Sequence, residues 1–182
     1  VETLARELHH LLQSLGPGRP VILVGHGTGA GVARTYAHRY PFETSALVLV
    51  DPMHEGFGDL LRREQVAPLK PSAWGIGLAS VLGRFGLLRL LNSRQYPNAH
   101  LPQPPSVRAE VDAHELDCEP RNVAYLSGLA ATPDLPVRAI VATETLQASD
   151  APADFPREAY NRLWVEQSEA FLDVSRRAQR VL

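Results

Sequence analysis

A short apolar run that ends in a glycine-rich turn constrains this chain more than any other feature. Residues 21–24 read Val-Ile-Leu-Val, and residues 25–29 read Gly-His-Gly-Thr-Gly. The apolar run predicts a buried strand. Small residues follow it and predict a helix that packs close to that strand. The turn between strand and helix must be sharp, so we expect its central residue, Gly27, to have strained dihedral angles with a positive φ.

Helices and strands alternate around this turn. Leucines at helical spacing predict an amphipathic helix over Glu2–Leu15, and a second helix is expected over residues 30–39. A second apolar strand is expected over residues 45–50, where Asp51 and Pro52 close it. This alternation is typical of a parallel sheet with helices packed against it.

The same alternation returns near the end of the chain. An apolar run over residues 136–142 predicts a third strand, and residues 157–173 predict a helix. Residues 178–182 read as the start of a last strand. The strands over 21–24, 45–50 and 137–142 are therefore expected to be parallel neighbours.

The strand, turn and helix around Gly27 resemble the nucleophile elbow of the α/β-hydrolase superfamily, and the resemblance is strongest over Glu2–Gly56. A dinucleotide-binding loop is disfavoured because Gly25, Gly27 and Gly29 do not give its Gly-X-Gly-X-X-Gly spacing. The resemblance implies an α/β fold of the α/β-hydrolase type, with a doubly wound, mostly parallel sheet and a helical cap insertion.

The resemblance also assigns roles at the elbow. The central position of the motif is usually the serine nucleophile, and here it is Gly27, which has no side chain to attack a substrate. The backbone N–H of Thr28 corresponds to one half of the oxyanion hole. Gly25 and Gly29 are expected to let the helix approach the strand. We therefore expect a hydrolase fold that lacks its catalytic nucleophile.

The resemblance implies parts of the fold that this sequence does not contain. Strands that precede the elbow strand in the family, and the loop that supplies the second oxyanion donor, have no counterpart here. The catalytic histidine of the family follows the last strand, which would place it beyond Leu182. We therefore expect the chain to be a fragment of a hydrolase domain.

Residues 55–134 are expected to form the cap, between core segments at 1–54 and 135–182. Four helices are predicted in the cap, over residues 59–65, 74–91, 107–116 and 121–131, with proline-rich stretches between them. The apolar helix over 74–91 either buries its face in the cap or lines a hydrophobic pocket. Candidate pocket residues are His26, His54, Trp74 and Phe85.

Two carboxylates are candidates for the acid of the catalytic triad. Asp51 follows the second strand, at the sheet edge where such sites lie. Glu144 follows the third strand and is the alternative. Asp51 is preferred, although it is equally compatible with a role that only caps the turn.

Composition excludes several classes of function. A net charge of −2 without a basic patch argues against nucleic-acid binding. Cys118 is alone, and the histidines lack metal-ligand spacing, so no metal is expected. The segment 74–91 is short and is interrupted by Arg84 and Arg89, which argues against stable membrane insertion. No signal peptide is visible, which favours the cytoplasm.

The function expected from this resemblance is ancestral cleavage of a small apolar or ester-like substrate, without a cofactor. The alternative is a pseudo-hydrolase whose pocket binds a small molecule or a partner. A third reading is that Gly27 is an engineered or erroneous substitution. The sequence leaves the substrate and the oligomeric state open.

Overall fold

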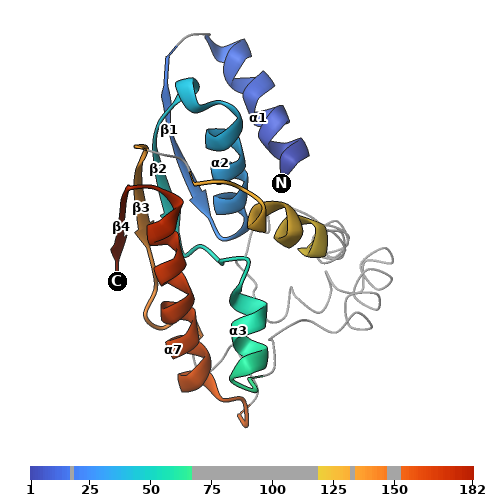
Figure 1. Cartoon of the computed structure of the whole chain (residues 1–182), viewed down its shortest axis with the longest axis vertical. Helices are drawn as coiled ribbons and strands as arrows, with labels where there is room; N and C mark the ends of the chain where they lie inside the picture. The colour runs from blue at the N-terminus through green and yellow to red at the C-terminus, as the bar shows by residue number, and fades with distance from the viewer. Residues whose placement is uncertain (17–18, 67–118, 132–133, 147–152) are drawn as a thin grey trace, which may run out of the picture. The chain divides into compact units, whose positions relative to one another are not determined.

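The computed structural model describes residues 1–16, 19–66, 119–131, 134–146 and 153–182 (Figure 1). The chain divides into two compact units, which are residues 1–68 with 122–182, and residues 69–121. The first unit carries the sheet and nearly all of the described residues. The predicted helices at 74–91 and 107–116 lie outside the described residues, as do Trp74 and Phe85. The predicted cap at 55–134 stays a prediction.

Four parallel strands form the sheet of the first unit, in the order β1-β2-β3-β4. Their bounds are Val21–His26 for β1, Thr44–Val50 for β2, Pro136–Ile140 for β3 and Arg177–Val181 for β4. The predicted parallel arrangement of the first three strands is confirmed, and the last predicted strand forms as β4. All four strands end at one edge of the sheet, and that carboxyl edge carries the site described below.

The helices follow the predicted pattern with small shifts. α1 spans Glu2–Leu15, α2 spans Thr28–Arg39, α3 spans Phe57–Arg63 and α7 spans Arg157–Gln167. The helix expected over 157–173 is divided, because a 3-10 helix (η2, Ser168–Val174) replaces its last part. A second 3-10 helix (η1, Pro41–Glu43) precedes β2. Residues 119–127 are also helical.

The main core lies between one face of the sheet and the helices. Leu47, Leu49 and Val137 are at most 1% exposed, and they pack with residues of α2 and η2. α2 lies on the sheet, and α1 packs beside α2 with Ala5 fully buried (Figure 1). Ile22 and Val24 alternate with the buried positions of β1 and are 63% and 69% exposed. The described elements therefore cover one face of β1 and leave the other open.

A second, smaller core joins α3 to α7, which lie side by side in Figure 1. Phe57 of α3 meets Trp164 of α7 edge to face, with ring centroids 5.2 Å apart. Val141, which directly follows β3, is buried in the same cluster. This core therefore fixes the indole of Trp164 next to the carboxyl edge of the sheet.

Candidate active site at the carboxyl edge of the sheet

The turn between β1 and α2 has the geometry expected for an elbow. Gly27 has φ 54° and ψ −121°, so the predicted positive φ is confirmed. Its N–H donates to the carbonyl of Val50 at 3.1 Å, and its carbonyl accepts from Ala30 N–H at 3.1 Å. These main-chain hydrogen bonds connect the turn to the neighbouring strand β2 and to the start of α2.

The close approach of strand and helix depends on Gly25. A Cβ at that position would lie 2.5 Å from the carbonyl oxygen of Gly29, which is far inside van der Waals contact. A Cβ on Gly29 would meet no atom within 4 Å in the part of the chain that the structure describes. The expectation that both glycines are needed is thus corrected, since Gly29 contributes its backbone and not a missing side chain.

Position 27 has room for a side chain. A Cβ built on Gly27 meets no atom of the described residues within 4 Å, and the positive φ would strain a larger residue there. Thr28 begins α2 and is exposed, and His26 at the end of β1 is also exposed. The oxyanion role of the Thr28 N–H and the pocket role of His26 stay predictions.

Asp51 follows β2 with φ 47°, a conformation that aspartate tolerates better than most residues. Its N–H donates to the carbonyl of Ile140 at 2.7 Å. Its Oδ1 accepts from the indole Nε1–H of Trp164 at 2.7 Å and from the N–H of Ala142 at 3.1 Å. The Thr145 hydroxyl is 3.4 Å from Oδ2. Both carboxylate oxygens of Asp51 are therefore engaged.

Glu144 lies in the turn after β3, within reach of open space. Its side chain is exposed, and it lines a groove of ≈ 890 Å³ together with Leu146, Phe155 and Asn161. Asn161 holds the end of the turn, because its Oδ1 accepts from Leu146 N–H at 2.9 Å and its Nδ2 donates to Leu146 O at 3.1 Å. The turn that carries Glu144 is therefore tied to α7.

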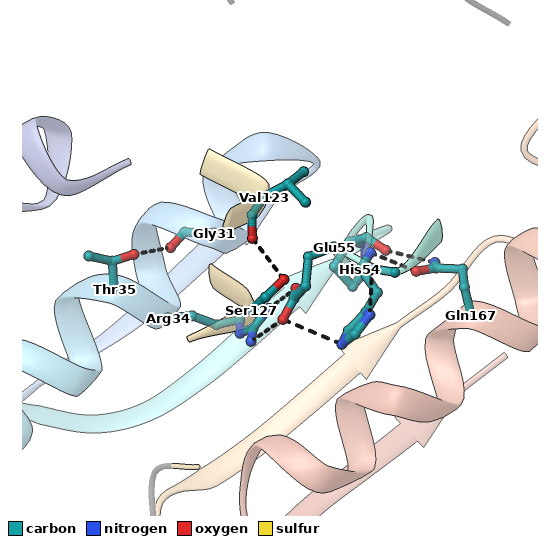
Figure 2. Close-up of polar contacts among 10 residues, drawn as sticks. Gly31, Arg34, Thr35, His54, Glu55, Val123, Ser127 and Gln167 are labelled. Atoms are coloured by element: carbon teal, nitrogen blue, oxygen red, sulfur yellow. Dashed lines mark hydrogen bonds and ion pairs between the residues drawn. The ribbon is translucent and has the colours of Figure 1, made fainter. Parts of the chain in front are cut away.

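A buried ion pair connects α2 with the segment that follows Asp51 (Figure 2). The guanidinium of Arg34 donates to both carboxylate oxygens of Glu55, at 2.8 and 3.1 Å. Each of these two side chains is 8% exposed. The guanidinium also lies over the ring of Phe171, with its Cζ 5.6 Å from the ring centroid.

His54 and Gln167 complete this group, which we call the Arg34 cluster: Arg34, His54, Glu55 and Gln167. The backbone N–H of His54 donates to Gln167 Oε1 at 2.6 Å, and Gln167 Nε2 donates to the carbonyl of Pro52 at 3.0 Å (Figure 2). His54 Nδ1 accepts from Gly56 N–H at 3.1 Å, and Nε2 lies 3.5 Å from Glu55. The proton of the neutral ring is therefore assigned to Nε2.

Burial and neighbouring charges shift two pKa values in the Arg34 cluster. Burial lowers the pKa of His54, and the charge of Arg34 lowers it further, against the opposing effects of Glu55 and Asp173. Burial acts to raise the pKa of Glu55, but the hydrogen bonds and charge of Arg34 outweigh it and hold the pKa below its ordinary value. The cluster therefore favours a neutral imidazole beside an ionised carboxylate.

The structure places several predicted site residues at the carboxyl ends of neighbouring strands and places His54 in the Arg34 cluster. Gly27, Asp51 and Glu144 follow β1, β2 and β3, three neighbouring strands. His54 belongs to the Arg34 cluster and lines a cavity of ≈ 140 Å³ with Arg34, His38, Glu55 and Asp173. The roles proposed for these residues stay predictions.

Sequence reasoning missed the partners that hold the site. Trp164 and Gln167 lie on α7, more than one hundred residues from the groups that they bind. Arg34 gave the one visible signal, because a charged residue stands among the small residues of α2 that face the core. Its partner Glu55 carried no such signal.

Two further structural tests concern only the residues that the structure describes. None of their His, Cys, Asp and Glu side chains form a group of three or more that could hold a metal ion. None of the helices they form has both the length and the apolar character that a membrane span needs.

Comparisons with known proteins show the family of the chain and leave the site residues untested. The sequence profile of the Alpha/beta hydrolase family matches residues 1–178. The human (Lyso)-N-acylphosphatidylethanolamine lipase is 39% identical over 72 residues, which are 39% of this chain and 20% of that protein. The mouse protein of the same name is 38% identical over 72 residues. The chain thus spans about one fifth of the length of these curated relatives.

Solved structures show a similar fold. A probable hydrolytic enzyme from Pseudomonas aeruginosa PAO1 superposes with a TM-score of 0.60 at 22% identity, over 99% of this chain and 61% of that chain. Cfl2 from Burkholderia cenocepacia superposes with a TM-score of 0.53 at 16% identity, over 98% of this chain and 62% of that chain. At these identities the likeness supports the fold alone.

Proposed function

The chain belongs to the alpha/beta hydrolase family, and from this premise we propose that it derives from an ester-cleaving enzyme and does not itself cleave esters. The observation that carries the proposal is the elbow. Its backbone has the positive φ and the strand-to-helix turn of a nucleophile elbow, while Gly27 supplies no hydroxyl. Hydrolysis by this fold needs attack by that residue and an acyl-enzyme intermediate.

The rest of the elbow is suited to stabilise negative charge. Thr28 begins α2, so its N–H belongs to the free donors of a helix N-terminus. We assign the Thr28 N–H as one oxyanion donor. Removing the nucleophile alone lowers kcat by a factor on the order of 10⁶. A site that keeps such donors but loses its nucleophile is therefore expected to bind an acyl group without cleaving it efficiently.

The substrate class follows from the relatives. The curated relatives are named as lipases of an N-acyl phospholipid, and they share 72 residues with this chain. We propose a lipid or ester with an apolar acyl chain as the ligand of the site. The groove beside Glu144 is lined by Leu146 and Phe155, two apolar side chains suited to an acyl chain.

The alternative function is a pseudo-hydrolase that binds an apolar ligand or a partner without converting it. The absent side chain at Gly27 favours it as well. Both proposals use the same site. The first predicts that a protein with a restored nucleophile cleaves esters, and the pseudo-hydrolase proposal does not predict this.

Initial rates of p-nitrophenyl butyrate cleavage test the proposal. The unmodified chain and its Gly27→Ser variant should both stay at background, because a serine hydroxyl without a positioned base is a weak nucleophile at neutral pH. Gly27→Ser in an extended protein that also supplies a base and a second oxyanion donor should raise the rate by about 10³-fold or more. Gly29→Ser in the same extended protein is the matched control and should stay at background.

Turnover by the unmodified chain would contradict the proposal outright. A background rate from the restored, extended protein would favour the pseudo-hydrolase. Binding of a fluorescent fatty-acid ester to the unmodified chain, followed by anisotropy, would then show whether the site still holds an acyl ligand.

A further inference from the structure

Asp51 occupies an unusual position in the ladder between β2 and β3. Residues Val50 and Ile140 are partners in the parallel register, and the N–H of Asp51 continues the ladder to the carbonyl of Ile140. In a regular parallel ladder the next donor, the N–H of Ala142, would bind the main-chain carbonyl of residue 51. It binds the side chain instead, at Asp51 Oδ1 and 3.1 Å.

The positive φ of Asp51 explains the exchange. At φ 47° the chain turns away from the sheet, so the carboxylate takes the place that a strand carbonyl would fill. The Ala142 N–H thereby keeps an acceptor at the point where the ladder ends. A carboxylate is a stronger acceptor than an amide carbonyl, which favours this arrangement at a strand end.

The same carboxylate also reaches α7 and the loop between β3 and α7. Oδ1 accepts from the indole of Trp164 at 2.7 Å, and the Thr145 hydroxyl lies 3.4 Å from Oδ2. Trp164 is 8% exposed and is packed against Phe57, so its indole is a fixed donor. Asp51 thus ties together the end of β2, the segment after β3 and the middle of α7.

The segment 142–146 is held at both ends by these contacts. Asp51 binds it at Ala142 and Thr145, and Asn161 binds both main-chain groups of Leu146. Glu144 stands between the two anchor points, exposed and facing the groove. Among the described residues no hydrogen bond or ion pair engages its side chain, whereas both oxygens of Asp51 already have donors.

We propose that Asp51 is a positioning residue, which together with Trp164 and Asn161 holds the segment 142–146 so that Glu144 is the carboxylate presented at the sheet edge. This inference rests on the proposed function, because it divides the two candidate acids of that site between two roles. It reverses the order of preference between Asp51 and Glu144 that sequence analysis favoured. It requires no activity in the present chain, so it is tested separately.

Amide exchange and ¹H–¹⁵N spectra of the whole chain test the proposal. Asp51→Ala should raise the exchange rates of the Trp164 indole N–H and the Ala142 N–H by about tenfold or more, because both lose their acceptor. Asp51→Asn should change them less than about twofold, since the amide Oδ1 accepts the same bonds and Nδ2 donates to the Thr145 hydroxyl. The indole signal of Trp164 is identified by its loss in Trp164→Phe.

Two more variants keep the test decisive where Asp51→Ala does not fold. Asn161→Ala should shift the amides of residues 144–146 and leave the Trp164 indole unchanged. Glu144→Gln is the control and should leave the Ala142 and Trp164 signals in place, because within the described residues no hydrogen bond links it to them. Two results would overturn the positioning role. One is unchanged exchange rates at the Ala142 N–H and the Trp164 indole in Asp51→Ala, and the other is fast exchange at both groups in Asp51→Asn.

The role of Glu144 is read from the extended Gly27→Ser protein used for ester cleavage. Glu144→Gln should lower kcat by about 10²-fold or more with little change in KM, whereas Asp51→Asn should retain most of kcat. The opposite pattern would make Asp51 the acid. Lack of turnover in the extended Gly27→Ser protein would instead contradict the proposed function. The amide-exchange result would still test the positioning role of Asp51.

Discussion

The elbow around Gly27 and the Arg34 cluster lie in one unit of the molecule but are held by different forces. Main-chain hydrogen bonds and a close glycine contact define the elbow. Side-chain charges define the cluster, where Arg34 and Glu55 pair at 2.8 Å with little solvent exposure. The conformation of the elbow thus does not depend on a side chain at its centre, whereas the Arg34 cluster is formed by side chains.

This difference explains how the fold accommodates Gly27. Gly27 has no side chain, so the turn is held without one, and glycine suits the positive φ better than serine does. Removing one partner from the Arg34 cluster would instead leave a buried charge without its counter-ion. The nucleophile can therefore be lost from the elbow without loss of the fold, whereas a single substitution in the Arg34 cluster is expected to destabilise the fold.

The largest effect is expected from breaking the buried pair. Arg34→Met should lower the free energy of unfolding by about 3–5 kcal/mol, because Glu55 stays buried without a cation. The double variant Arg34→Met/Glu55→Leu should recover a large part of this loss. Urea unfolding followed by circular dichroism measures both. A single variant as stable as the parent would show that Glu55 reaches solvent and that the cluster does not resemble a closed ion pair.

A smaller effect is expected from the two glycines of the elbow. Gly25→Ala should destabilise the chain by about 3 kcal/mol, since its Cβ would lie 2.5 Å from the backbone oxygen of Gly29. Relieving this clash would require the backbone of α2 to shift. Gly27→Ala and Gly27→Ser should each cost only about 1 kcal/mol, through backbone strain without a clash. Urea midpoints measured under one condition compare the three. Equal losses at positions 25 and 27 would remove the distinction between close approach and strain.

The smallest effect is expected from titration of the Arg34 cluster. Burial lowers the pKa of His54 below the unfolded value of 6.5, so the unfolded chain binds more protons in the window between the two values. The contribution of His54 is therefore fully present above pH 6.5 and is lost as the pH falls toward the folded pKa. His54→Gln should flatten the rise of stability with pH between about 5 and 7.

Unfolding free energies at several pH values, for the parent and for His54→Gln, measure this dependence. His10→Gln is a suitable control, because His10 lies on α1 and takes no part in the Arg34 cluster. Parallel pH profiles for the parent and His54→Gln would show that the buried imidazole does not carry the pH dependence.

Much of the fold was determined by local sequence patterns. Alternating apolar runs and amphipathic helices predicted the parallel strands, and the Gly-His-Gly-Thr-Gly turn predicted the positive φ of Gly27. These predictions succeeded because each depends on residues within a few positions of one another. The preference of glycine for left-handed dihedral angles and the periodicity of buried side chains are both local properties.

Only the tertiary structure decided what Asp51 and Arg34 bind. The partners of the Asp51 carboxylate lie 91 to 113 residues away, and Glu55 lies 21 residues from Arg34. Such pairs exist because the strand register places Val50 beside Ile140, and α7 is packed against α3 by the second core. A sequence pattern shows that Asp51 ends a strand, but the acceptors and donors that surround it depend on which elements the fold brings to that edge.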